Sequence, residues 1–166
     1  LAGVCLLTES RGGAIALVFA QRYPEKVERV VAVATGFFSD DKLILKCGLT
    51  YCDFARLDPG MRELLAEMHG PEYVRTFWAA SARYRTTYIM SRGYDLRPRL
   101  AAVKCPVLLV NGDRDFYFDV GHALQAHRLM KLSRLWIVPR CGHDVHLEHK
   151  GEFVRNVASF FAEPRA

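Results

Sequence analysis

The 166-residue chain has a length typical of one domain, and its 51% hydrophobic and 25% charged residues are those of an ordinary globular protein. The net charge of +5 comes from 23 basic and 18 acidic residues, and because the bases are scattered among acids and apolar residues, we expect no nucleic-acid partner. Apolar runs stay short of the ~18 residues of a membrane span, so we expect no membrane partner. The first residues lack a basic region and a small-residue cleavage site, so we expect no signal peptide.

Cysteine usage indicates the redox compartment. The five cysteines form an odd set without paired Cys-x-x-Cys spacing, and two of them, Cys5 and Cys105, lie in or beside apolar runs. Cysteine in such a run behaves as a small hydrophobic side chain. This pattern argues against a disulfide framework and predicts a cytoplasmic protein.

The first part of the chain alternates strand and helix patterns. The run from Val4 to Thr8 is apolar and of strand length, and residues 12–22 have a helical pattern that Pro24 ends. Residues 30–34 form a second short run that is β-branched and rich in alanine. Runs that are apolar on both faces predict parallel strands with helices on both sides.

The middle of the chain, residues 37–98, changes character. Residues 61–68 and 72–84 have helical spacing between turn-forming Pro and Gly residues. We expect a small helical insertion, or cap, over a core formed by residues 1–36 and 99–166. Its aromatic residues are more typical of a packed cap core than of a substrate wall; they are Phe77, Trp78, Tyr84 and Tyr88.

The alternation resumes at Pro106. Two further apolar runs predict strands, and each is followed by a turn or loop and then by a helical pattern. The predicted strands are residues 107–110 and 135–138, the turn is 111–113, the loop is 140–143, and the helices are 120–132 and 148–161. About four parallel strands flanked by helices, with right-handed connections, predict an α/β fold.

Three residues carry the chemistry. A serine hydroxyl needs a base to take its proton and a third group to orient that base. Ser10 lies at the turn after the first strand, Asp115 follows the third and His143 follows the fourth, so all three belong to one edge of a parallel sheet. The helix N-terminus aims backbone N–H groups, first that of Arg11, at any oxyanion formed there.

Other roles stay open for these polar residues. A serine at a strand-to-helix turn is often only a helix cap, and Asp113 and Asp119 are more typical of a turn former and a helix cap than of catalytic groups. His143, His146 and His149 follow one another at three-residue spacing, but no cluster of cysteines or carboxylates accompanies them as metal ligands. We therefore expect no metal site.

The motifs resemble the α/β-hydrolase superfamily from its nucleophile elbow onward. Thr8-Glu9-Ser10-Arg11-Gly12 is similar to the elbow Gly-x-Ser-x-Gly, although Thr8 replaces the first glycine and its β-branched side chain crowds the turn. Asn111-Gly112-Asp113-Arg114-Asp115 resembles the end of the family's acid strand, with Asp115 as the acid, and Gly142-His143 resembles its histidine loop.

The resemblance implies a partial α/β-hydrolase fold with a helical cap. It implies a serine hydrolase that acts on a small apolar ester, lactone or related acyl substrate through Ser10, His143 and Asp115, without a cofactor. The family's first strands, and the loop that donates a second oxyanion N–H, would precede Leu1. Loss of one such donor costs about 10²–10³-fold in turnover, so we expect the chain alone to be impaired.

A non-catalytic role in binding or assembly is the alternative. In the complete fold the strand from Val4 to Thr8 is central, so in this chain it would leave an unpaired apolar edge. We expect this edge to pair with a second copy, which gives a homodimer, or with a separate N-terminal half.

Overall fold

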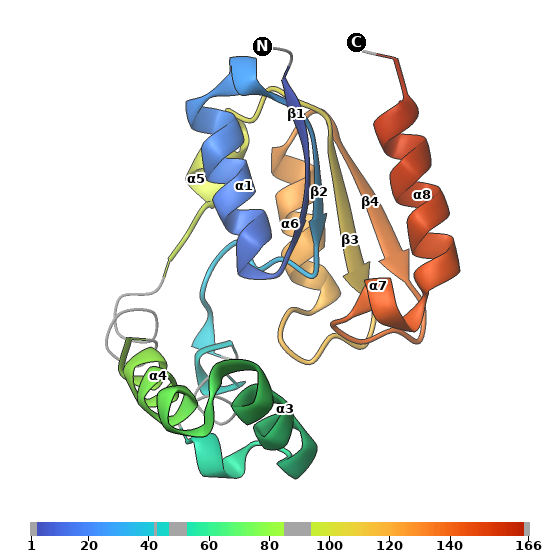
Figure 1. Cartoon of the computed structure of the whole chain (residues 1–166). Coiled ribbons are helices and arrows are strands. Elements are labelled where there is room, and N and C mark those ends of the chain that lie inside the picture. The colour runs from blue at the N-terminus through green and yellow to red at the C-terminus, as the bar shows by residue number, and fades with distance from the viewer. Residues whose placement is uncertain (1–2, 42, 47–52, 85–93, 165–166) are drawn as a thin grey trace. The chain divides into compact units, whose positions relative to one another are not determined.

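A computed structural model describes residues 3–41, 43–46, 53–84 and 94–164 (Figure 1). The chain divides into two compact units. The first combines Leu1–Phe38 with Asp95–Ala166, and the second is Ser39–Tyr94. No helix in the described ranges is both long and apolar enough to cross a membrane.

The first unit is built on a parallel sheet of four strands in the order β1-β2-β3-β4. These strands are Val4–Glu9, Val27–Val33, Val107–Gly112 and Ser133–Val138. The two inner strands are almost entirely buried, since valine, leucine and alanine side chains point into both faces. The predicted α/β class, with four parallel strands flanked by helices, is confirmed.

Helices cover both faces of this sheet (Figure 1). One face packs against α1 (Arg11–Arg22), α5 (Arg97–Leu100) and α6 (Val120–Leu129), which connect successive strands. The other packs against α7 (Val145–Glu148) and α8 (Lys150–Ala162), which bury Val145, Phe153, Val157 and Phe160. Right-handed crossovers that step in one direction across a sheet place their helices on one face, as seen here.

Several predicted boundaries are wrong, and β2 and β4 begin earlier than expected. β3 runs through Gly112 rather than turning at residues 111–113, because Asn111 and Gly112 still pair with Ile137 and Val138 of β4. The helix expected over residues 148–161 begins two residues later, as α8 from Lys150, and Glu148 instead ends the separate short helix α7. The helix expected to reach residue 132 ends at Leu129.

The second unit contains the expected helices as α3 (Pro59–His69) and α4 (Pro71–Tyr84), after a short 3-10 turn, η2 (Phe54–Arg56). The Asp58 side chain caps α3 by accepting a hydrogen bond from the Met61 N–H. Of the aromatic set, Trp78 packs edge-on against Phe54, but Phe77 and Tyr84 are 47% and 51% exposed, so the predicted packed core is wrong for these two. Tyr88 lies outside the described residues.

Candidate active site

Ser10 is held in a strained turn between β1 and α1. Its φ of 51° lies in the left-handed region that residues other than glycine rarely adopt, at a cost of about 1–3 kcal/mol. Its N–H donates to the carbonyl oxygen of Val33 at 2.8 Å, and its own carbonyl accepts from the Gly13 N–H at 3.1 Å. The side chain makes no capping hydrogen bond, which argues against the helix-cap alternative.

The residues around Ser10 explain how this turn is tolerated. A Cβ on Gly13 would lie 2.0 Å from Thr35 Oγ1, so α1 can approach the end of β2 only with glycine there. The Thr8 hydroxyl donates to the carbonyl oxygen of Val31 at 2.9 Å, which directs this side chain toward β2. Thr8 is therefore accommodated in the elbow. Arg11 begins α1, so its N–H belongs to the first turn, where backbone donors have no intrahelical partner.

The Asp115 carboxylate is a buried acceptor of three hydrogen bonds. Its side chain is completely shielded from solvent. Oδ1 accepts from the N–H groups of Tyr117 and Phe118, at 2.8 and 3.1 Å, and Oδ2 lies 2.9 Å from His143 Nδ1. A carboxylate in this position fixes the ring proton on Nδ1 and leaves Nε2 of His143 as a base.

His143 lies in the loop after β4, with a side chain only 20% exposed and the Tyr117 ring edge-on at 5.0 Å. Burial by itself lowers the pKa of His143, but the hydrogen bond and charge of Asp115, together with the charges of Asp144 and Glu9, outweigh it and raise that pKa above its ordinary value. Glu9, the last of these charges, directly precedes Ser10 in the sequence.

Backbone contacts join the loop that carries Asp115 to the loop that carries His143. The Arg114 N–H donates to the carbonyl oxygen of Cys141 at 2.9 Å, and Asp113 Oδ1 accepts from the Cys141 N–H at 3.2 Å. Asp113 is thus an anchor between the two loops, a role that sequence reasoning missed. Burial, followed by the charges of Glu148 and nearby aspartates, raises the pKa of Cys141 to about 11, so its thiol does not compete as a nucleophile.

The remaining polar candidates have other partners. Asp119 accepts from the Gly121 N–H at 2.8 Å as the N-cap of α6, so its predicted capping role is confirmed. His146 Nδ1 lies 3.1 Å from Glu9 Oε1, and His149 Nδ1 lies 3.9 Å from Glu152 Oε2. Within the described part of the chain, no three histidine, cysteine or carboxylate side chains gather in a way that could hold a metal ion.

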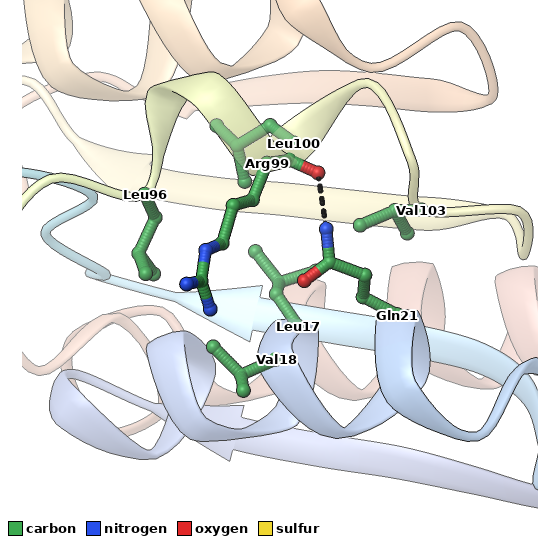
Figure 2. Close-up of a pocket in the computed structure, with 7 residues that line it drawn as sticks. All are labelled: Leu17, Val18, Gln21, Leu96, Arg99, Leu100 and Val103. Atoms are coloured by element: carbon green, nitrogen blue, oxygen red, sulfur yellow. Dashed lines mark hydrogen bonds between the residues drawn. The ribbon is translucent and has the colours of Figure 1, made fainter.

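A shallow apolar depression lies between α1 and α5 (Figure 2). Leu17 and Gln21 line it from the second half of α1, and the Gln21 side chain donates to the carbonyl oxygen of Arg99 at 2.8 Å. Its volume of about 10 Å³ has room for a single water molecule. Because Leu17 is already about 10 Å along the helix from Ser10, this depression is not the substrate site.

Comparisons with known proteins identify the family of the chain. Residues 1–156 match the alpha/beta hydrolase family. The chain is 30% identical over 159 residues to the Homo sapiens serine hydrolase BPHL. This alignment covers 95% of the chain and 54% of BPHL. It is 26% identical over 177 residues to the 2-hydroxy-6-oxo-6-phenylhexa-2,4-dienoate hydrolase of Burkholderia cepacia, with coverage of 95% and 62%. The chain thus spans about half to three-fifths of the length of these two relatives.

Solved structures share the fold. MGS-M2, an α/β hydrolase from a Medee basin deep-sea metagenome library, has a TM-score of 0.75 at 20% identity and covers 99% of this chain and 67% of that one. The enol-lactonase of Burkholderia xenovorans LB400 has a TM-score of 0.70 at 17% identity, with coverage of 98% and 66%. Since the family match extends over all four strands of the sheet and most of α8, the chain belongs to the α/β-hydrolase family.

Proposed function

We propose that this chain acts as a serine hydrolase on a small apolar ester, lactone or related acyl compound. The observation that carries the proposal is the 2.9 Å contact between His143 Nδ1 and the buried Asp115 carboxylate, at the carboxyl ends of the parallel strands, where Ser10 directly follows β1. Further support comes from relatives that are named dienoate hydrolases and an enol-lactonase, names that imply substrates with a reactive carbonyl group.

The proposed reaction proceeds through an acyl-enzyme. The Ser10 hydroxyl attacks the substrate carbonyl while Nε2 of His143 takes its proton, and the Arg11 N–H donates to the resulting oxyanion. Collapse of this intermediate expels the alcohol, which receives the proton from His143. Water then attacks the acyl group by the same steps and restores Ser10. Asp115 stays ionised throughout, orients His143 and stabilises its cationic form.

Turnover of p-nitrophenyl butyrate and of a γ-lactone tests this function. We expect Ser10→Ala to lower kcat/KM by about 10³-fold or more, because the proposed acyl-enzyme forms on the Ser10 hydroxyl. The matched control is Ser81→Ala in α4, which should keep the parent rate because Ser81 lies in the other unit. Undiminished turnover by folded Ser10→Ala would rule out this nucleophile.

A second candidate function, binding or assembly without catalysis, is favoured by the outer side of β1. Among the described strands, β1 pairs with β2 alone, and Val4 and Leu7 are 49% and 52% exposed. Cys5 between them is also exposed. The unpaired N–H and C=O groups of an apolar edge strand can pair with a strand of another chain. In a two-fold symmetric dimer, the β1 edges of two copies would pair with each other. We therefore propose a second copy of the chain as its occupant.

Light scattering at tens of micromolar tests the assembly proposal. We expect the parent chain to be dimeric and Leu7→Lys to be monomeric, because a lysine on an edge strand opposes pairing between strands. Leu147→Lys is the control, since Leu147 is also exposed, at 68%, but lies on α7. A monodisperse monomer for the parent chain would contradict the proposal, and a separate N-terminal fragment that binds the monomer would identify the other expected occupant.

A further inference from the structure

Glu9 and His146 make a close polar contact beside the proposed triad. Glu9 is the last residue of β1, directly before Ser10, and His146 lies in α7, three residues after His143. Glu9 Oε1 is 3.1 Å from His146 Nδ1. This oxygen is shielded from solvent and accepts no well-aligned hydrogen bond, so the contact with His146 is electrostatic. The pair joins the strand that carries the nucleophile turn to the helix that follows the histidine.

Other contacts hold α7 from different sides. Val145 is fully buried in the cluster between the sheet and α8, and the His146 ring lies edge-on to Phe153 of α8 at 6.2 Å. The Gly142 N–H donates to both carboxylate oxygens of Glu148 at 3.0 Å, which closes the histidine loop on itself. These contacts fix α7 to the sheet core and to α8, whereas the Glu9–His146 pair fixes it to β1.

We propose that Glu9 and His146 are positioning residues, which hold His143 at the Ser10 turn by tying α7 to the end of β1. This inference rests on the proposed hydrolase function. The two side chains are 39% and 37% exposed, so their contact adds little to stability. The contact acts through geometry instead. Because α7 has only four residues and His143 lies two residues before it, a shift of α7 would also move His143.

Glu9 also contributes to the charge around His143. Asp115 after β3, Asp144 before α7 and Glu9 at the end of β1 carry the charges that act against burial to raise the pKa of His143. Removal of the Glu9 carboxylate should therefore lower that pKa.

A double-mutant cycle on ester turnover tests the positioning role. We expect Glu9→Gln and His146→Gln each to lower kcat/KM about two- to fivefold, the range for a partly exposed ion pair, and the double variant to lose no more than either single variant. The matched controls are His149→Gln and Glu152→Gln, another histidine–carboxylate pair that lies wholly at the start of α8, and both should keep the parent rate. Additive losses in the double variant would overturn the proposal.

NMR titration of the His143 imidazole gives a readout that requires no turnover. Glu9→Gln should lower the pKa of His143, because one of the charges that raise it is removed, whereas the control Glu152→Gln should leave it unchanged. An unchanged pKa of His143 in Glu9→Gln would overturn the inference about Glu9 while the Ser10 dependence of turnover still stands. Full activity of Ser10→Ala would instead overturn the proposed mechanism through Ser10, so the two failures are distinguishable.

Discussion

Asp115→Asn should lower kcat/KM for ester hydrolysis by about 10³–10⁴-fold while the fold stays intact. The amide nitrogen of asparagine would replace the oxygen that faces His143 Nδ1 at 2.9 Å. Because an amide nitrogen donates rather than accepts, the ring would carry its proton on Nε2 and could no longer accept the proton of Ser10. Steady-state kinetics, with circular dichroism to verify folding, measures this effect.

Asp113→Asn is the matched control for this substitution. Asp113 lies on the same loop, but its Oδ1 accepts from the Cys141 N–H, and an asparagine oxygen can accept the same bond. We expect its kcat/KM to stay close to that of the parent chain. Equal losses in the two variants would mean that the loop, rather than the orientation of His143, accounts for the effect of Asp115.

The pH dependence of the same variant has a predicted sign. Because the pKa of His143 is raised and the base must be neutral, kcat/KM of the parent chain should rise with pH along a limb whose midpoint lies above about 6.5. In Asp115→Asn the burial that lowers this pKa remains while the largest opposing contribution is gone, so the residual activity should have its limb at lower pH. A midpoint that does not move would contradict this account of His143.

Gly112→Ala should be the most destabilising single substitution proposed for this chain. A Cβ at Gly112 would lie 2.1 Å from the carbonyl oxygen of Gly142 and 2.2 Å from that of Cys141. Both obstacles are backbone, so β3 and the histidine loop must separate, and the contact between Asp115 and His143 would be lost with them. We expect a loss of about 3 kcal/mol in the free energy of unfolding, the upper end for overpacking, together with loss of turnover.

Urea unfolding measures the effect of Gly112→Ala, with Gly151→Ala as its control. Gly151 lies in the first turn of α8, and a Cβ there would meet only the Arg155 guanidinium at an ordinary 3.6 Å. This control should be neutral or slightly stabilising, because alanine favours a helix over glycine by up to about 1 kcal/mol. The same urea midpoint for Gly112→Ala and the parent chain would contradict the close contact between the two loops.

The strands could be predicted because their apolar runs are short and bounded by turn residues. Errors arose where tertiary contacts override local signals. Gly112 belongs to a sequence typical of a turn, yet it stays in β3 because its partner Val138 continues the ladder. The break at His149 between α7 and α8 carries no glycine or proline, so no local pattern marks it. Phe77 is exposed although its helical spacing resembles that of a buried face.

The sequence predicts the residue types of the candidate site and their order along the chain, but it does not predict which side chains are in contact. Ser10, Asp115 and His143 each follow a strand, and the topology of a parallel sheet brings those positions to one edge. Glu9 escaped notice because its partner, His146, lies near the other end of the sequence and no local motif joins them. Only the folded chain shows that the two residues meet.

The most direct test of activation of Ser10 by His143 is labelling with a fluorophosphonate probe followed by peptide mass mapping. We predict a single covalent adduct on Ser10, which is absent in Ser10→Ala, retained in Ser81→Ala and formed orders of magnitude more slowly in His143→Ala. A folded protein that remains unlabelled at Ser10, or one that is labelled equally fast without His143, would contradict this account.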